Sequence, residues 1–470
     1  RSGPGPGPDG GRPACWRRPA QRRGIPAGLN RPAAREADPE VMTQLTEQTR
    51  LPNGIRVITE TMPQVRTAAL GVWIGAGSRY ERPEVHGISH FLEHLLFKGT
   101  TSRTALDIAQ QVDAVGGQMN AFTDKELTCL YVRVLADHLP VVMEIMADML
   151  LRSAFDPQAI ERERQVILEE IKSYEDSPDE LVQDLFAQTI WNGHLLGRPV
   201  IGTVETVRRL DRDAFLAYVG ERYRPDNAVV AAAGDVLHAG VVRLVEETLG
   251  DWQGSAVPVA PEAPGTDPAI VVRTKATEQV HLALGAPALP QAHERRYVLS
   301  VLDNLLGGGM SSRLFQEIRE KRGLVYTITS YVAAYREGGL FVIYGAMSPE
   351  TAPQVTRLVL EEIEKVKDAV PADELRRARE SLKGAVMLGL ESTGSRMGKL
   401  ARSELYYGRQ ISLDEILAQI DAVTAEDVQA MARELLVPER MAMAAIGPFR
   451  TDGRLEGELR EALRPGAAVA

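Results

Sequence analysis

The sequence predicts an α+β protein made of two homologous halves, each a mixed sheet packed with helices. Three observations predict this class: a proline-rich break near the middle of the chain, a repeat across that break, and strand patterns that alternate with long helical patterns in each half. With 470 residues, of which 44% are hydrophobic, the chain is long enough to bury more than one core.

Two proline-rich stretches set the domain limits. Residues 256–268 contain four prolines in 13 residues, which predicts an extended linker between the halves 42–255 and 269–470. Residues 1–41 hold eight prolines, seven glycines and eight arginines against four acidic residues. Such a composition cannot bury enough apolar surface to offset its ordering entropy, so we expect a disordered extension there. The alternative is a targeting segment, which arginine richness also favours.

The repeat indicates how each half is built. The segment that begins at Leu210 matches the one that begins at Val423 without a gap, and in both a helical pattern runs into a proline and then an apolar strand that ends in glycine. The strand pattern at 68–78 likewise resembles 282–290, and a helical pattern follows each. The strands predicted in the first half include 54–60, 68–75 and 118–133.

Charge and cysteine content exclude several classes of protein. The net charge of −10 argues against nucleic acid or an anionic membrane as a partner. No apolar run approaches the ~20 residues of a membrane-spanning helix. The two cysteines, Cys15 and Cys129, exclude a disulfide framework and a cysteine-based zinc site, and they favour a reducing compartment.

The pentapeptide HFLEH, His90 to His94, carries the strongest chemical signal. Apolar residues spaced around it predict a helix with one buried face, and place the two histidines and Glu93 on the opposite stripe. Imidazoles four residues apart stand one turn apart and can chelate a single zinc ion, while Glu93 could take a proton from the hydrolytic water. The order of residues is that of the inverted zinc-peptidase motif. The alternative is a solvated polar face.

A second helix, predicted to begin at Asp156 and Pro157, offers a third metal ligand. Glu163 and Glu170 are seven residues apart, so they point almost the same way, and both fall within the apolar stripe of this helix. A carboxylate that faces a core is costly unless it is paired or bound to a metal. The alternative is a pair of salt-bridged glutamates at the edge of the stripe.

With HFLEH followed 76 residues later by Glu170, the chain resembles the pitrilysin/insulinase zinc metallopeptidases, and within them the mitochondrial processing peptidase β-subunits and their bacterial homologues. The resemblance covers residues 45–450. It implies that the two halves form half of a clam-shaped chamber around one zinc ion per chain. The roles it implies are zinc ligation by His90, His94 and Glu170, general-base catalysis by Glu93, and orientation of the site by Glu163.

The second half keeps the helix but not the metal ligands. Alignment of the two halves places Ser300, Asp303 and Asn304 opposite the two histidines and the glutamate of HFLEH. The resemblance implies that this half contributes Arg319 and Tyr326, which would hold the scissile carbonyl and its developing oxyanion. The alternative is an ordinary charged helix followed by a strand tyrosine.

Substrate contacts are predicted in the first half. We expect the segment 116–134 to form an edge strand beside the metal helix, and the resemblance implies that Asn120, Ala121 and Phe122 pair with an extended substrate by strand addition. Glu180 and Asp184 lie one helical turn apart and match positions that receive an arginine upstream of the cut in processing peptidases. A solvated acidic face is the alternative.

We therefore predict a zinc-dependent endopeptidase that cleaves unfolded peptides or presequences. Relatives of this size pair their subunits, and retention of both the zinc motif and the Arg319/Tyr326 pair favours a homodimer. The predicted compartment is the bacterial cytoplasm, with the mitochondrial matrix as the alternative. Two other functions are open: a catalytically silent scaffold subunit of the respiratory core type, and a β-type subunit that is active only with a different α-type partner.

Overall fold

Two mixed sheets with the same topology form the framework of the computed structural model, which describes residues 46–255, 262–449 and 453–463. The first sheet has the strand order β1-β2-β6-β3-β5-β4, and the second has the order β7-β11-β8-β10-β9. In each sheet one parallel pair, β2 with β6 and β7 with β11, adjoins a run of antiparallel pairs. The expected α+β class with two homologous mixed-sheet halves is confirmed.

Six strands and eight α-helices lie within the described residues 46–255. The strands are β1 (Thr46–Arg50), β2 (Arg56–Thr61), β3 (Thr67–Ile74), β4 (Gln118–Thr123), β5 (Thr128–Leu135) and β6 (Ala228–Gly234). The helices are α1 (Ile88–Leu96), α2 (Ala105–Ala114), α3 (Leu139–Arg152), α4 (Pro157–Glu175), α5 (Pro178–Ile190), α6 (Val204–Arg209), α7 (Arg212–Arg222) and α8 (His238–Leu249).

Five strands and seven α-helices follow residue 262 within the described part of the chain. The strands are β7 (Ile270–Thr274), β8 (Val280–Ala288), β9 (Val325–Ala334), β10 (Gly339–Met347) and β11 (Ala442–Gly447). The helices are α9 (Arg296–Leu306), α10 (Ala352–Asp368), α11 (Ala372–Gly389), α12 (Thr393–Tyr407), α13 (Leu413–Asp421), α14 (Ala425–Leu435) and α15 (Arg454–Ala462), and a π-helical turn covers Phe315–Glu320.

Two of the predicted segments lie wholly or partly outside the residues that the structure describes. The extension 1–41 and the part 256–261 of the predicted linker lie outside the described residues. None of the helices in the described ranges is long and apolar enough to cross a membrane.

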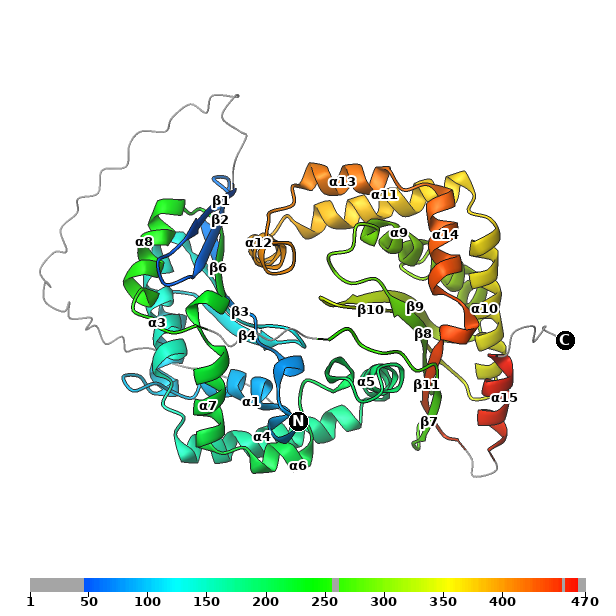
Figure 1. The fold of residues 1–470 in the computed structure, drawn as a ribbon, viewed down its shortest axis with the longest axis horizontal. Helices are drawn as coiled ribbons and strands as arrows, with labels where there is room; N and C mark the ends of the chain where they lie inside the picture. The colour runs from blue at the N-terminus through cyan, green and yellow to red at the C-terminus, as the bar shows by residue number, and fades with distance from the viewer. Residues whose placement is uncertain (1–45, 256–261, 450–452, 464–470) are drawn as a thin grey trace, which may run out of the picture. The chain divides into compact units, whose positions relative to one another are not determined.

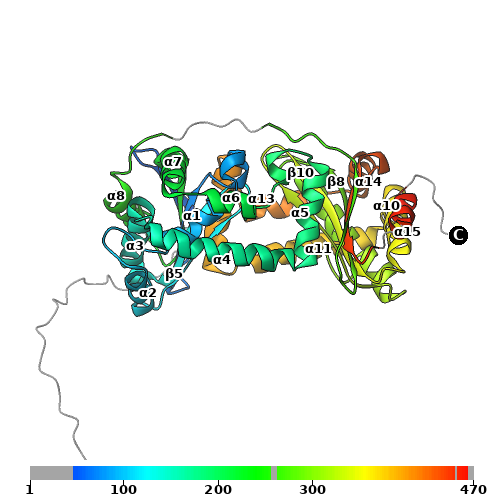
Figure 2. The ribbon, with the colours of Figure 1, turned by 90° about the horizontal axis from the view of Figure 1, so that it is seen from below.

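Each sheet is buried on both faces, and each half lends a helix to cover the sheet of the other. Helix α12 lies between β10 and β11 of the second sheet in the chain, yet it packs on β6 and β3 of the first (Figure 1). Helix α5 follows α4 of the first half and packs on β11 and β8 of the second (Figure 2). Buried side chains of the two exchanged helices, such as Leu400 and Phe186, belong to these shared cores.

A glycine in the central strand of each sheet lets the exchanged helix approach. A Cβ added to Gly71 on β3 would lie 2.8 Å from Sδ of Met397 on α12. A Cβ added to Gly285 on β8 would lie 3.0 Å from Cζ of Phe186 on α5 and still closer to a strand carbonyl. These glycines are aligned by the repeat between 68–78 and 282–290, so the same local feature serves the same contact in both halves.

Candidate metal centre

Helix α1 is fixed in place at its first turn by Glu81. The carboxylate of Glu81, which is 2% exposed, accepts hydrogen bonds from the backbone N–H groups of Gly87 (2.7 Å) and Ser89 (2.8 Å). His86 is buried beside the same carboxylate, with its Nδ1 3.0 Å away. The cap therefore comes from an acid that satisfies the free N–H groups of the helix.

The apolar face of α1 is buried as predicted, and its polar stripe faces α4 and β4. There His90, His94 and Glu170 bring one donor atom each to within 4.8 Å of one another. Nε2 of His90 lies 3.7 Å from Oε1 of Glu170, and Nε2 of His94 lies 3.7 Å from Oε2. The two helices thus bring together residues that are 76 positions apart.

The spacing of these three donors fits a zinc ion. Zinc bonds of 2.0–2.1 Å in tetrahedral geometry place neighbouring donor atoms roughly 3.3 Å apart. The 3.7 Å distance from each imidazole to one carboxylate oxygen of Glu170 is close to that value and too long for a direct hydrogen bond. Two imidazoles with one carboxylate are a donor set that catalytic zinc sites use, and such sites keep a fourth position open.

Burial keeps His90 in the form that binds metals. Desolvation, and secondarily the neighbouring His94, lowers the pKa of His90 to about 4, so its imidazole is neutral near pH 7. The buried Nδ1 of His90 has no hydrogen-bond partner among the described residues. Glu170, expected inside a buried stripe, is in fact 45% exposed at its side chain, which leaves the centre open to solvent.

Glu163, which the resemblance assigns to orientation of the site, lies beside one of the two histidines. Its Oε2 lies 3.4 Å from Nδ1 of His94, on the ring edge opposite the donor that faces Glu170. The other carboxylate oxygen of Glu163 pairs with Nζ of Lys98 at 2.8 Å. Hydrogen bonds of this kind fix the tautomer and the direction of a ligating imidazole. Glu169 is 72% exposed and pairs with Lys172, so it is turned away from the centre.

Glu93 lies on the side of the centre that faces β4. Burial raises the pKa of Glu93, while a hydrogen bond with Thr123 and the nearby His94 oppose that shift. The charge of Glu170 acts on the same carboxyl, which shows that Glu93 is electrostatically coupled to the centre. A half-buried carboxylate beside two imidazoles is suited to proton transfer.

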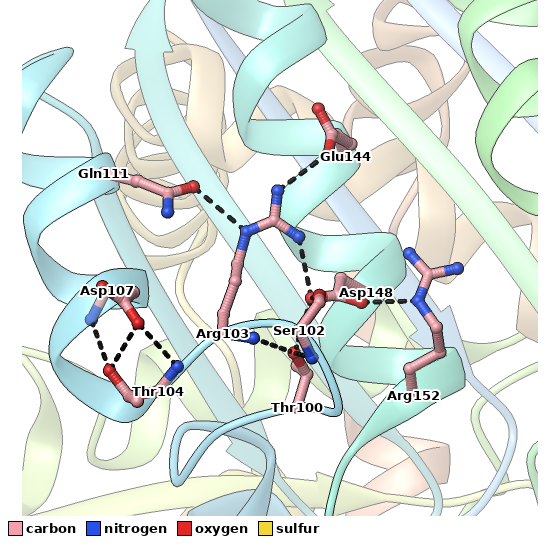
Figure 3. Close-up of polar contacts among 9 residues, drawn as sticks. All are labelled: Thr100, Ser102, Arg103, Thr104, Asp107, Gln111, Glu144, Asp148 and Arg152. Carbon is pink, nitrogen blue, oxygen red and sulfur yellow. Dashed lines mark hydrogen bonds and ion pairs between the residues drawn. The ribbon is translucent and has the colours of Figure 1, made fainter.

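The loop that follows α1 is clamped to α3 by Asp148, which has no exposed surface (Figure 3). Its Oδ2 accepts hydrogen bonds from Thr100 (2.6 Å), Ser102 (2.8 Å) and Arg103 (2.7 Å), and Arg152 donates to Oδ1 at 2.5 Å. Burial alone would raise the pKa of Asp148, but these bonds hold that pKa well below its usual range. The clamp fixes the loop at the C-terminal end of α1.

The segment 116–134 is two strands rather than the single strand that we expected. Asp124 accepts the backbone N–H groups of Glu126 and Leu127 at 2.7 and 2.8 Å, and this closes a turn between β4 and β5. Strand β4 is the sheet edge beside α1, as predicted. It carries the three residues expected to contact substrate: Asn120 is exposed, Ala121 is buried, and Phe122 packs edge-on against Trp73 at 5.4 Å.

The two acids expected to receive an arginine lie on α5, and their surroundings differ. Glu180 is exposed. Asp184 accepts a hydrogen bond from the hydroxyl of Tyr174 at 2.8 Å and lies 3.7 Å from Nζ of Lys125. Part of the charge of Asp184 is therefore already balanced.

Among the described residues, neither Arg319 nor Tyr326 forms a hydrogen bond or ion pair with His90, His94 or Glu170. Arg319 lies over the ring of Phe315 at 4.8 Å, within the π-helical turn. Tyr326 is 75% exposed on β9, the edge strand of the second sheet. Helix α9 ends at the glycine run that begins at Gly307, and it carries Ser300, Asp303 and Asn304 where α1 carries His90, Glu93 and His94.

Sequence reasoning missed Lys98 and Glu81. Lys98 follows His94 by four residues, one helical turn, so its position beside the second histidine was available from spacing alone. Glu81 lies six residues before Gly87, outside the range of the usual capping patterns, and no sequence signal marks it.

Comparison with known proteins gives matches to both halves. Residues 56–204 match the family described as Insulinase (Peptidase family M16), and residues 209–382 match the Peptidase M16 inactive domain. An uncharacterized zinc protease of Streptomyces coelicolor is 45% identical over 86% of this chain and 90% of its own length, and one of Bacillus subtilis is 42% identical over 84% and 97%. A protease from Helicobacter pylori shares the fold, with a TM-score of 0.80, 24% identity, and coverage of 86% of this chain and 99% of its own.

Proposed function

Because the chain belongs to the insulinase family of peptidases, peptidase family M16, we propose that it is a zinc-dependent endopeptidase. The observation that carries the proposal is the convergence of His90, His94 and Glu170 from two helices on one point beside Glu93. These three residues would hold one zinc ion per chain. When bound, zinc supplies the Lewis acidity that activates a hydrolytic water and polarises the peptide carbonyl.

The side chains of the centre have distinct tasks in this reaction. Glu93 takes a proton from the attacking water and returns it to the leaving amine, as a half-buried carboxylate can. Glu163 accepts from Nδ1 of His94 and keeps the opposite nitrogen of that ring directed toward Glu170. Lys98 pairs with the other oxygen of Glu163, so it positions the His94 ring indirectly, through Glu163.

Arg319 and Tyr326 are assigned to the oxyanion by resemblance. Tyr326 is exposed on an edge strand, where its hydroxyl is free to donate to a bound carbonyl. Their contribution requires the second half to approach the centre when substrate binds, as the halves of a closing chamber would.

The substrate is proposed to be an extended, unfolded peptide. The edge strand β4 presents Asn120, Ala121 and Phe122 beside α1, and strand addition there would hold a peptide through sequence-independent backbone hydrogen bonds. Glu180 and Asp184 are proposed to receive an arginine, with Glu180 as the main contact because Asp184 already has two partners. Unchanged preference for arginine-containing peptides in a Glu180→Asn/Asp184→Asn variant would remove this assignment.

The decisive experiment compares two neighbouring glutamates of α4. We expect Glu170→Gln to lose bound zinc and turnover of a fluorogenic peptide, and Glu169→Gln, which alters an exposed residue one position away, to keep both. A chelator should stop hydrolysis by the wild type, and added zinc should restore it. Hydrolysis by Glu170→Gln at the wild-type rate, or hydrolysis that chelation does not affect, would overturn the proposal.

A homodimer is proposed as the working form, because one chain carries both the metal set and the Arg319/Tyr326 pair. Light scattering on the purified single chain, together with a peptidase assay on the same fractions, tests it. An inactive single chain would favour a β-type subunit that needs a different partner, and a zinc-free chain would favour a scaffold.

A further inference from the structure

The second half contains a pocket of about 540 Å³ that the proposed chemistry does not use. It lies among β9, α9, α11, α12 and α13, and its size is within the range of pockets that hold small ligands or ligand fragments. Its polar lining combines cationic and aromatic side chains with neutral ones: Arg296, Lys399, Arg402, Tyr297, Tyr407, Gln291, Ser300 and Ser403. No carboxylate is among the residues that line it in the described part of the chain.

Two of these cations lack an acidic partner. The guanidinium of Arg296 lies over the rings of Tyr297 (4.3 Å) and Tyr407 (5.0 Å) and donates to the hydroxyl of Tyr297 at 3.1 Å. Among the described residues, neither Arg296 nor Lys399 forms an ion pair with a carboxylate. Arg296 helps to lower the pKa of Glu415, but the carboxylate of Glu415 is paired with Arg409. The two terminal nitrogens of Arg409 donate to that carboxylate at 2.8 and 2.5 Å.

The amine of Lys399 is only partly satisfied. It donates to the backbone carbonyl of Ile411 at 2.6 Å, and burial lowers its pKa. The nearby Glu60 opposes that shift, but the carboxylate of Glu60 is paired with Arg396. A half-buried ammonium that has one neutral acceptor is less stable than one with an anionic partner. An anion in this pocket would therefore be stabilised by Lys399 and Arg296 together.

The pocket is connected to the strand that we propose for substrate binding. Arg402, three residues after Lys399 on α12, reaches Oδ2 of Asp124 at 3.6 Å. Asp124 directly follows the last residue of β4. The pocket wall also includes Ser300 of α9, which the repeat aligns with His90. The ion pair of Arg402 therefore links the pocket wall to the end of β4.

We propose that the pocket formed around Arg296 and Lys399 binds a carboxylate of the peptide substrate, either an acidic side chain or the C-terminal carboxylate. This inference rests on the proposed peptidase function, and it adds a second determinant of substrate choice, away from the zinc centre. It predicts that peptides are selected by negative charge beyond the segment that pairs with β4.

The test measures binding without cleavage. In the Glu93→Gln chain, fluorescence anisotropy gives Kd for one labelled peptide in three forms: with a glutamate and a free C-terminus, with that glutamate replaced by glutamine, and with a C-terminal amide. We expect one replacement to weaken binding roughly tenfold, the loss typical of a charge-assisted hydrogen bond, and so to identify the source of the carboxylate. Adding Arg296→Gln/Lys399→Gln should abolish that discrimination and leave the Kd of the weaker peptide unchanged.

Two controls separate charge from folding. Arg243→Gln/Arg376→Gln removes two exposed cations from α8 and α11 and should preserve the discrimination. Arg296→Lys/Lys399→Arg keeps both charges and should retain most of it. Equal Kd values for the three peptides would overturn the pocket assignment, and so would discrimination that survives Arg296→Gln/Lys399→Gln. Neither result would contradict peptide turnover by the wild type. Carboxylate-dependent binding by a chain whose wild type cuts no peptide would instead overturn the peptidase function alone.

Discussion

Helices α1 and α9 occupy equivalent places in the two halves but differ in chemistry. Each packs its apolar face into its own core and lies beside an edge strand, β4 or β9. Helix α1 presents two imidazoles and Glu93, whereas α9 presents Ser300, Asp303 and Asn304. The buried face of such a helix fixes its position, so the residues on the opposite stripe can change without loss of the fold.

The acid on α9 is the most informative part of this comparison. Asp303 aligns with Glu93, and burial raises the pKa of Asp303 to about 6 even though Ser330 on the edge strand donates to it at 2.6 Å. Burial likewise raises the pKa of Glu93, and Thr123 on β4 opposes that shift. The second half thus has an acid, Asp303, that is hydrogen-bonded to its edge strand, but it lacks the two imidazoles that accompany Glu93 in the first half.

The largest expected effect separates these two acids. Glu93→Gln should lower peptide turnover by roughly 10²–10⁴-fold, because it removes the general base, and should leave bound zinc unchanged. Asp303→Asn should keep turnover within about twofold of wild type, since the alignment gives Asp303 no metal neighbour. Zinc content and kcat on a fluorogenic peptide check both variants. Equal turnover for wild type and Glu93→Gln would refute the assigned base.

The exchanged helices allow a test of whether the halves unfold independently. Phe186→Ala on α5 should destabilise the fold by about 3–5 kcal/mol, and Leu400→Ala on α12 by about 2–5 kcal/mol, because both side chains are fully or almost fully buried. Since each helix belongs to the core of the other half, each variant should lower the midpoint of one shared unfolding transition. Calorimetry that shows two transitions, with only one of them moved by Phe186→Ala, would argue against this coupling.

The loops after α1 and α9 predict a difference in acid sensitivity. The loop after α1 depends on the ionised Asp148, whereas the loop after α9 begins with three glycines. A depressed pKa in the folded state means that Asp148 stabilises the fold above its unfolded pKa of about 3.9, and that this stability is lost as the pH falls below it. We expect Asp148→Asn to cost about 2–4 kcal/mol at pH 7, and its difference from wild type to shrink below about pH 4.

Urea titrations of wild type and Asp148→Asn at pH 7 and at pH 3 check this prediction. A difference in unfolding free energy that is the same at both values would mean that the charge of Asp148 is not what holds the loop.

The smallest predicted effect concerns Lys98, a residue that the sequence did not predict at the candidate metal site. Lys98→Met should weaken zinc binding roughly 10- to 100-fold, because Glu163 would lose the partner that fixes its carboxylate beside His94. Lys98→Arg should recover most of the affinity. Lys172→Met, which breaks an exposed pair on α4, is the matched control, and competition with a fluorescent zinc chelator measures all three.

The apolar periodicity predicts the helix that carries HFLEH and its buried face, whereas the assignment of the distant Glu170 depends on the family resemblance. The apolar spacing around HFLEH set α1 to within a residue or two, but no local pattern states that a glutamate 76 residues away will meet it. The sequence predicts one strand over 116–134, although residues that strands disfavour lie near its middle, at Asp124 to Glu126. The turn at Asp124 depends on a side chain that accepts two backbone amides.

The exchange of α5 and α12 could not have been read from the chain. An amphipathic pattern shows that one face of a helix is buried, but it does not identify the sheet that buries it. Both helices follow elements of one half directly and then cover the sheet of the other. Tertiary contacts between distant segments decide this choice, and only the arrangement of both sheets reveals it.

This exchange has a consequence for any attempt to divide the protein. A chain cut between Ser255 and Glu262 would give two fragments, each with one uncovered apolar sheet face and one orphaned helix. Expressed alone, either piece should aggregate or stay partly unfolded. Produced together, the pieces should recognise each other through those same surfaces and restore the active assembly by complementation, without a covalent connection.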